Sequence, residues 1–334
     1  MTIKELAKIA GVSYSTVSKS LNDSSEISPE TKARIKKLAE EHNCFINTNA
    51  RNLKTKRSNT IAIIFSRDEF YGHNVSILCN TLMNSISQEI ERHNYNFLVN
   101  VSHNKDGESY VKLLHSQGLV DGFILATWDP MDEEIDYLNR YNVPYAFAIM
   151  SPKPIDGVAY FLNDNRAEGY LATKYLIGKG LDRIVTITSC NSADRAYEER
   201  TQGYCQAMEE ANLTPQVIFH SMNHLQAHQL LFSNIDTFRN CNAVYVQWDG
   251  LAGTFMQELT LQGFRVPDDI SIIGHNDYYI ATYFVPLLTT VHDARSEQIR
   301  KAVDYVVQRI SGTDSVPEVN KATGYIVERD SVIR

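Results

Sequence analysis

Short apolar runs alternate with longer amphipathic stretches along the chain from about residue 60 onward. The stretch at 75–94 repeats apolar residues at helical spacing, whereas the runs on either side of it are short and mostly apolar. This alternation predicts an α/β fold with parallel sheets covered by helices on both faces. The runs form two series, which predict two doubly wound lobes of similar construction. They lie at 60–65, 95–101, 122–127 and 143–149, and then at 183–189, 216–220, 243–248 and 270–275.

The first 45 residues have a different pattern, with apolar residues at helical spacing in three short stretches. A first helix is expected from Ile3 to Ala10, where Gly11 ends it and permits a tight turn. Val17 and Leu21 face inward from a second helix that is otherwise small and rich in hydroxyl groups. A third helix is predicted to follow Ser28, with proline at its first position. The candidate N-caps of the three helices are hydroxyl side chains: Thr2, Ser13 and Ser28.

A helix, a short glycine-containing turn and a hydroxyl-rich second helix are typical of a helix-turn-helix unit that reads DNA. Charge supports this interpretation. Residues 1–60 hold 11 basic and 6 acidic side chains, a balance of +5, whereas the remaining residues hold 21 basic and 34 acidic ones, a balance of −13. A basic head on an acidic body is expected when only the head meets a polyanion. An unevenly charged, solvated surface and a three-helix bundle without a DNA function are the alternatives.

The bulk composition is that of a globular protein, with 43% hydrophobic and 22% charged residues. No apolar run approaches the length of a membrane span, and no signal peptide is recognisable, so we expect a cytoplasmic protein. The five cysteines are scattered and lack CxxC spacing, which favours reduced thiols over disulfides or a zinc site.

The sequence contains no GxSxG, Walker or GxGxxG motif, so we expect neither an enzyme nor a cofactor. Three histidines recur every four residues, at His220, His224 and His228. Because His220 is expected to end a strand, the three would not share a helical face. We therefore expect no metal site there.

Three segments make the resemblance to one family specific: IKELAKIAGVSYSTVSKSLN from Ile3, ISPETKARIKKLAEEHN from Ile27 and NARNLKTKRSNTIAIIF from Asn49. With them the chain resembles the LacI/GalR family of bacterial transcriptional regulators from end to end. The resemblance implies that Tyr14, Ser15 and Lys19 read bases, and that Lys19 stands where many relatives have arginine. Side chains implied to anchor to phosphates are Thr2, Ser13, Thr16, Ser18, Asn22 and Ser28.

The resemblance also gives a role to residues 46–57, which could otherwise be taken for a flexible basic tether. In the family this segment is a hinge helix that forms on the operator, where paired helices occupy the minor groove and a leucine opens a base step. Leu53 matches that leucine, and Ala50 and Arg51 match the positions before it. Asn49 replaces the usual valine between the paired helices. Cys44 and Ile46 are two further departures.

The body resembles periplasmic sugar-binding proteins, with an effector in a cleft between the lobes. Arg200 matches an arginine that points into this cleft, although a structural salt bridge is the alternative. Further effector contacts are expected from Phe70, Tyr71, Trp248 and Asn276. As an effector contact, Trp248 would stack on a sugar or a planar base. The alternative is that Trp248 packs in the core. By family, a sugar or sugar phosphate is the expected effector.

The sequence thus predicts a helix-turn-helix head at 1–45, a hinge at 46–57, an N-terminal lobe and a C-terminal lobe. The lobes are expected at 58–157 with 291–319, and at 158–290 with 320–334. The chain would cross between them near Val158, Thr290 and Asn320.

The predicted function is a ligand-responsive repressor of carbohydrate-uptake or catabolic genes that binds a palindromic DNA operator as a homodimer. Whether the effector induces release or acts as corepressor is left open. The alternative is a cytosolic sugar-binding or carbohydrate-processing protein whose N-terminal helices do not bind DNA.

Overall fold

The computed structural model describes the chain except for residues 22, 45–56, 68–69, 71–75, 128, 130, 151–154, 191–194, 222–225, 314–318 and 334. Its contacts divide the chain into two compact units, Met1–Asn59 and Thr60–Arg334. Among the described residues, no helix combines the length and apolar character that a membrane crossing requires.

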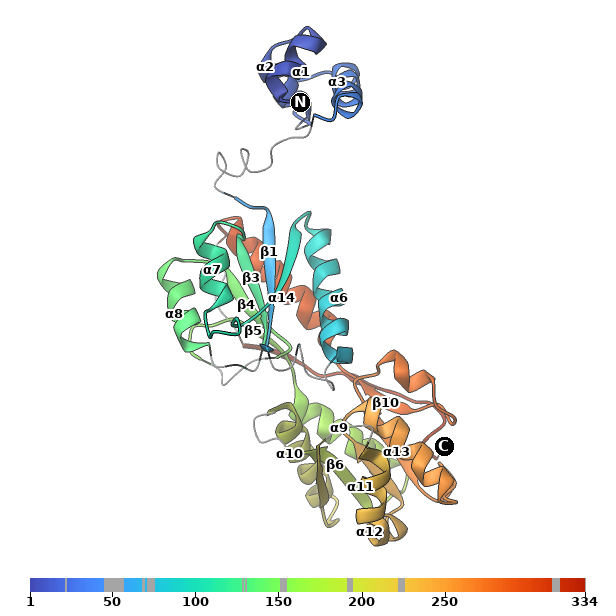
Figure 1. Cartoon of the computed structure of the whole chain (residues 1–334). Coiled ribbons are helices and arrows are strands. Elements are labelled where there is room, and N and C mark those ends of the chain that lie inside the picture. The colour runs from blue at the N-terminus through green and yellow to red at the C-terminus, as the bar shows by residue number, and fades with distance from the viewer. Residues whose placement is uncertain are drawn as a thin grey trace. The chain divides into compact units, whose positions relative to one another are not determined.

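The first unit is a bundle of three helices, as predicted (Figure 1). They are α1 (Ile3–Ala10), α2 (Tyr14–Leu21) and α3 (Pro29–Glu41). Leu6, Val17 and Ile35, one from each helix, are completely buried against one another. Gly11 ends α1 in the left-handed region, with φ of 66°, which a residue without Cβ adopts at little cost. The three helices therefore share a small apolar core and begin at the expected residues.

The first lobe of the second unit is built on a parallel sheet in the order β11-β5-β4-β3-β1-β2. Its strands are β1 (Thr60–Phe65), β2 (Asn96–Val101), β3 (Gly122–Ala126), β4 (Tyr145–Ala148), β5 (Tyr160–Asn163) and β11 (Val319–Ala322). Alternate residues of β1 point to opposite faces, so Ile63 packs with one set of helices and Ile64 with the other. One face is covered by α6 (Ser76–Arg92) and α14 (Arg295–Ile310), the other by α7 (Tyr110–Ser116) and α8 (Asp132–Arg140).

The second lobe repeats this plan in the order β12-β10-β9-β8-β6-β7. Its strands are β6 (Ile184–Ser189), β7 (Gln216–His220), β8 (Ala243–Val246), β9 (Ser271–His275), β10 (Thr289–His292) and β12 (Tyr325–Val327). Only β12 runs antiparallel to its neighbour among these described pairs. Helices α9 (Asn165–Gly178) and α10 (Arg195–Glu210) cover one face, and α11 (Ala227–Ser233), α12 (Ile235–Asn240) and α13 (Asp249–Leu261) the other. The expected architecture of two doubly wound lobes is confirmed.

The places where the chain passes between the lobes differ from those expected. The crossings follow β5, β10 and β11, that is, they come after Asn163, after His292 and after Ala322. The expected crossings near Val158, Thr290 and Asn320 fall before or within these strands. The expected boundary at 157/158 therefore assigns β5 to the wrong lobe, and those at 290/291 and 319/320 divide β10 and β11 between the lobes. These strands have only four residues each, too few for the apolar pattern to show which sheet they join.

The crossings also orient the two sheets. Each one leaves a lobe at the C-terminal end of a strand, after β5, β10 or β11. The C-terminal edges of both sheets therefore meet at the junction of the lobes, where ligands of doubly wound folds bind.

Candidate functional site

Helix α2 of the first unit presents a surface of small polar side chains around one exposed aromatic ring. Tyr14 is 53% exposed, and Ser15 is exposed beside it, whereas Val17 is buried beneath. Ser18 and Lys19 are half-buried at the surface. The base-reading residues implied by the resemblance thus lie on the outer side of one helix. Their contact with DNA stays a prediction.

Three of the phosphate-anchoring candidates, Thr2, Ser13 and Ser28, lie at the N-termini of the three helices. The Thr2 hydroxyl accepts the Glu5 amide at 3.3 Å while the Glu5 carboxylate accepts the Thr2 amide at 2.9 Å, a complete capping box. The Ser13 hydroxyl accepts the amide of Thr16 at 3.0 Å. Ser28 accepts the amide of Thr31 at 3.3 Å. Since helix N-termini offer backbone N–H groups and positive dipole ends, all three are suited to face phosphates.

Lys19 is engaged by a neighbour in this structure. Its Nζ lies 2.5 Å from Glu26 Oε2, with 43% of the lysine side chain exposed. Exposed ion pairs of this kind contribute no more than about 1 kcal/mol. Little free energy is therefore lost when Lys19 leaves Glu26 to contact a base or a phosphate. Asn22 and the hinge candidates Asn49, Ala50, Arg51 and Leu53 lie outside the described residues.

In the second unit, Arg200 lies at the C-terminal edge of the second sheet and is 5% exposed. Its Nε donates to Asn165 Oδ1 at 3.0 Å and its Nη1 donates to the carbonyl of Gln247 at 2.9 Å. The guanidinium also lies 5.4 Å from the centre of the Tyr197 ring. Both hydrogen-bond partners are uncharged, and among the described residues Arg200 forms no ion pair and its Nη2 has no hydrogen-bond partner. The described residues therefore form no salt bridge with Arg200, which was the alternative interpretation. Its Nη2 donor remains for a ligand.

The aromatic and amide candidates are more buried than expected. Trp248 is 8% exposed and belongs to the apolar core between the second sheet and α13. The side-chain amide of Asn276 donates to Asp293 Oδ2 at 3.0 Å, so it faces the second crossing. Phe70 packs against Phe65, at the end of β1 in the first lobe, with ring centres 5.7 Å apart. Tyr71 lies outside the described residues.

A buried polar cluster that the sequence pattern did not reveal lies beside Arg200. His275, at the end of β9, is completely buried and its Nε2 lies 3.1 Å from Oε2 of the equally buried Glu168. Its Nδ1 lies 2.7 Å from the hydroxyl of Tyr245. The other Glu168 oxygen accepts the amide of Gly324, in the third crossing, at 3.1 Å. The sequence signal is a glutamate within a helix whose other inward positions are covered. It indicates that Glu168 is buried, but it does not indicate a partner 107 residues away.

A second missed group ties α14 to the same edge. Arg295 Nε donates to Asp293 Oδ1 at 2.7 Å, and its Nη2 donates to the carbonyl of Asn276. Its guanidinium lies 4.4 Å from the centre of the Tyr278 ring. Nη1 of Arg295 is buried without a hydrogen-bond partner among the described residues. The second crossing is therefore fixed to the strand end that carries the predicted effector contacts.

Burial sets the protonation of the Glu168–His275 pair. Removal from water, with Asp293 nearby, raises the pKa of Glu168 to about 8. Burial, with Arg200 and Arg295 nearby, holds the pKa of His275 well below its usual value. At neutral pH we therefore expect a neutral imidazole beside a largely protonated carboxyl group.

The stability of the second unit should fall as pH rises from 6.5 to 8. A carboxyl whose pKa is higher in the folded state binds a proton on folding, so the contribution of Glu168 decreases between its unfolded value and about pH 8. His275 contributes stability that increases with pH, but this increase ends near 6.5, the pKa of histidine in the unfolded chain. Above that pH the contribution of Glu168 still falls, by about 1.6 kcal/mol, and the buried Asp249, whose pKa burial raises to about 7, adds to the fall. Urea unfolding at the two pH values measures it.

Glu168→Gln should remove most of this fall. The matched control is Glu297→Gln, because the Lys301 partner keeps the pKa of the Glu297 carboxyl low, so it does not titrate in this range. An unchanged pH dependence in Glu168→Gln would show that the Glu168 carboxyl does not take up the proton.

The histidine repeat does not assemble a site in the described residues. His220 ends β7, and His228, on α11, lies 2.9 Å from Glu258 Oε2. His224 lies outside the described residues. Within the described part of the chain, no group of three or more His, Cys, Asp and Glu side chains is arranged to hold a metal ion.

Comparison with known proteins assigns both units. Residues 2–45 match the family described as "Bacterial regulatory proteins, lacI family", and residues 173–332 match "Periplasmic binding protein-like domain". The HTH-type transcriptional repressor PurR of Vibrio vulnificus (strain CMCP6) is 28% identical over 99% of this chain and 98% of its own length. PurR of Aliivibrio fischeri (strain MJ11) is also 28% identical, with the same coverage.

Solved structures share the fold across the whole chain. The lac repressor dimer bound to operator and the anti-inducer ONPF has a TM-score of 0.82 at 21% identity, covering 100% of this chain and 99% of that one. A transcriptional regulator CelR–cellobiose complex has a TM-score of 0.68 at 23% identity, covering 99% of both chains.

A helix-turn-helix head joined to a periplasmic-binding-protein-like body defines a ligand-responsive DNA-binding regulator of transcription. The chain combines a helix-turn-helix domain of the lacI family with a periplasmic-binding-protein-like domain, so the expectations of family and fold are confirmed. Because its relatives are transcriptional repressors, the expectation that it is not an enzyme is confirmed as well.

Proposed function

We propose that this protein represses transcription by binding a palindromic operator as a homodimer, and that a small effector at the junction of the lobes controls that binding. The observation that carries the proposal is the pairing of an exposed reading helix with a buried arginine that keeps a free donor at the ligand-binding edge of the second sheet. The relatives named as repressors support the sign of regulation.

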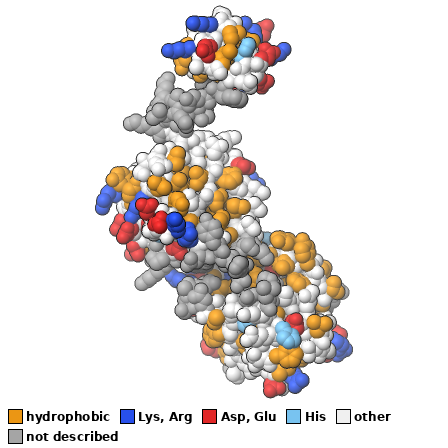
Figure 2. Space-filling model, viewed as in Figure 1, with side chains coloured by type: hydrophobic (Ala, Val, Ile, Leu, Met, Phe, Trp, Pro, Cys, Tyr) orange, Lys and Arg blue, Asp and Glu red, His pale blue; other side chains and the backbone are white. Residues whose placement is uncertain are grey.

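Exposed apolar side chains support the proposed dimer. Between residues 279 and 287, around the short helix η2 (Tyr279–Thr282), four large side chains are exposed to solvent: Tyr279, Tyr283, Val285 and Leu287. In the space-filling view, hydrophobic side chains also form broad areas on the Thr60–Arg334 unit (Figure 2). Such surfaces are typical of protein interfaces. A second copy of the chain would cover them and place two heads on a two-fold symmetric DNA site.

The proposed coupling runs through residues 46–57. There Asn49, Ala50, Arg51 and Leu53 would form a hinge helix on the operator, and Leu53 would insert at the central base step. An effector that alters the angle between the lobes would strengthen or weaken the pairing of two hinge helices. Both inducer and corepressor action fit this arrangement.

A sugar or sugar phosphate is the proposed effector, with carbohydrate-uptake or catabolic genes under its control. Arg200 offers a charged donor that suits hydroxyl and phosphate oxygens. Two solved structures of the same fold are complexes with sugars, one with cellobiose and another with D-xylulofuranose. A planar base remains the competing ligand, because aromatic side chains stack on bases as well.

Fluorescence of Trp248 should report effector binding. The chain has two tryptophans, so Trp128→Phe leaves Trp248 as the single reporter at the ligand-binding edge. We expect saturable quenching or a spectral shift with one class of ligand in a panel of sugars, sugar phosphates and nucleobases. The same ligand should change operator affinity by tenfold or more. Silence across the panel would argue against a small-molecule effector.

A further inference from the structure

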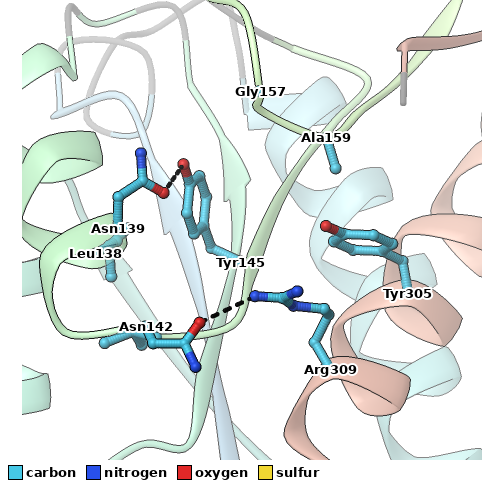
Figure 3. Close-up of a pocket in the computed structure, with 9 residues that line it drawn as sticks. Leu138, Asn139, Asn142, Tyr145, Gly157, Ala159, Tyr305 and Arg309 are labelled. Carbon is cyan, nitrogen blue, oxygen red and sulfur yellow. Dashed lines mark hydrogen bonds between the residues drawn. The ribbon is translucent and has the colours of Figure 1, made fainter. Parts of the chain in front are cut away.

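A cavity of about 70 Å³ lies in the first lobe at the edge opposite the crossings (Figure 3). It is lined by the end of α8, the start of β4, the residues that precede β5 and the last turns of α14. Tyr145 opens β4, which places the cavity at the N-terminal edge of the sheet. One water molecule needs about 15 Å³ of such space, so the cavity has room for a small ligand.

Polar side chains from both sides of the cavity turn toward one another. Figure 3 shows Asn139 and Asn142 on one side, Tyr305 and Arg309 of α14 on the other, and Tyr145 between them. The Tyr145 hydroxyl donates to Asn139 Oδ1 at 3.0 Å. Arg309 Nη2 donates to Asn142 Oδ1 at 3.1 Å.

These two hydrogen bonds engage the side-chain oxygens of Asn139 and Asn142 and leave their NH₂ groups without a bond among the described residues. Both asparagine oxygens are engaged, so each asparagine presents its NH₂ group. Arg309 has no ion-pair partner, and no hydrogen-bond partner besides Asn142, in the described part of the chain. None of the nine lining residues is acidic. The cavity therefore combines one positive charge with unused N–H donors.

Compensation of the helix dipole accounts for only part of this arrangement. A cation in the last turn of α14 interacts favourably with the C-terminal carbonyl groups. Arg309 is half-buried and bonded to Asn142, whereas an arginine that projects into solvent would serve that purpose equally well. It would not require a cavity, nor two asparagines whose oxygens are already engaged.

We propose that this cavity is a second ligand site, separate from the effector site, that binds a small oxyanion through Arg309, Asn139 and Asn142. A phosphate or carboxylate group supplies the acceptors that these donors lack, and both groups fit a space of this volume. The ligand would be free orthophosphate, or a phosphate or carboxylate group carried by a small metabolite.

Helix α14 connects this site to the edge where the effector is proposed to bind. It begins with Arg295, which holds Asp293 and Asn276, and Arg309 lies 14 residues further along. A helix of this length spans about 21 Å as one rigid element. A ligand that restrains one end of α14 therefore also restrains the other, a consequence that rests on the proposed function.

Titration of the full-length protein with orthophosphate, at constant ionic strength in chloride, tests the site. The readout is the thermal unfolding midpoint, confirmed by ³¹P NMR line broadening. We expect saturable binding that Arg309→Gln weakens at least tenfold. Arg300→Gln is the matched control, since it removes an equal charge from an exposed position of the same helix that pairs with Asp304. It should bind as the parent does.

Asn142→Asp provides a second variant that keeps the backbone conformation. Asn142 has φ of 50°, which aspartate tolerates, and the new carboxylate would pair with Arg309 and repel an oxyanion.

Competition by acetate would identify a general oxyanion site, whereas competition only by a phosphate ester would identify a phosphoryl site. Binding that persists unchanged in Arg309→Gln and Asn142→Asp, or no saturable binding of phosphate or acetate, would overturn the proposal.

Discussion

Gly169→Ala is expected to lower the unfolding free energy of the second unit by about 3 kcal/mol or more and to weaken effector binding. A Cβ atom at Gly169, on α9, would lie 2.1 Å from the carbonyl oxygen of Arg200 on α10. Across the same contact, a Cβ at Gly203 would lie 2.0 Å from the carbonyl oxygen of Arg166. The two helices thus touch backbone to backbone. Because no flexible side chain can move aside, the helices must separate, and overpacking of this kind is costly.

The loss of effector binding has the same cause, since the displaced backbone belongs to Arg200. Gly178→Ala is the matched control, because it lies on α9 as well and an added Cβ would meet no atom within 4 Å. That variant should be unchanged or slightly more stable, by up to about 1 kcal/mol. Urea unfolding and Trp248 fluorescence titration measure the two effects. Equal stability of the two variants would contradict the close contact of α9 and α10.

Removal of residues 1–59 should abolish specific DNA binding, with a loss of a thousandfold or more. These residues form a separate compact unit and include all of the predicted base and phosphate contacts. The cores of both lobes lie entirely within Thr60–Arg334. The truncated protein should therefore stay folded and still bind the effector. The remaining body is acidic, so it has no means to attract DNA.

Fluorescence anisotropy with labelled operator, at several salt concentrations, measures this loss. The full chain should bind with a steep inverse dependence on salt, because basic residues displace counterions from the phosphates. Tyr14→Ala offers a milder comparison, since an exposed side chain is removed without disturbing the bundle. Salt-dependent binding by the truncated protein would show that DNA contacts lie outside the head.

The elements with the strongest patterns were predicted correctly from the sequence. Strands β1 and β3 are buried along nearly their whole length, and nearly all of their residues are apolar. The caps of the head were predictable because Thr2, Ser13 and Ser28 act on amides only three residues away. The short strands β5, β10, β11 and β12 were not predicted. Strand β11, for instance, alternates exposed and half-buried positions, so nothing distinguishes it from a loop.

The effector edge could be predicted only in part. Arg200 lies at the C-terminal edge of the second sheet and its effector contact stays a prediction, whereas the side chain of Asn276 turns toward Asp293 and Trp248 lies mostly in the core. Periodicity indicates which positions are buried, not which distant partner a polar side chain finds. Glu168 and His275 are both on buried faces, yet only the packing of α9 against β9 brings them together.

Selection of bound duplexes from a random pool by the purified full-length protein, with and without cell metabolites, is the most direct test of the central claim. The account predicts enrichment of a two-fold symmetric site in at least one condition, with a constant central base step where Leu53 inserts. Enrichment only with metabolites would identify a corepressor. Failure to enrich any symmetric site in either condition would contradict the account of a paired-head, effector-controlled repressor.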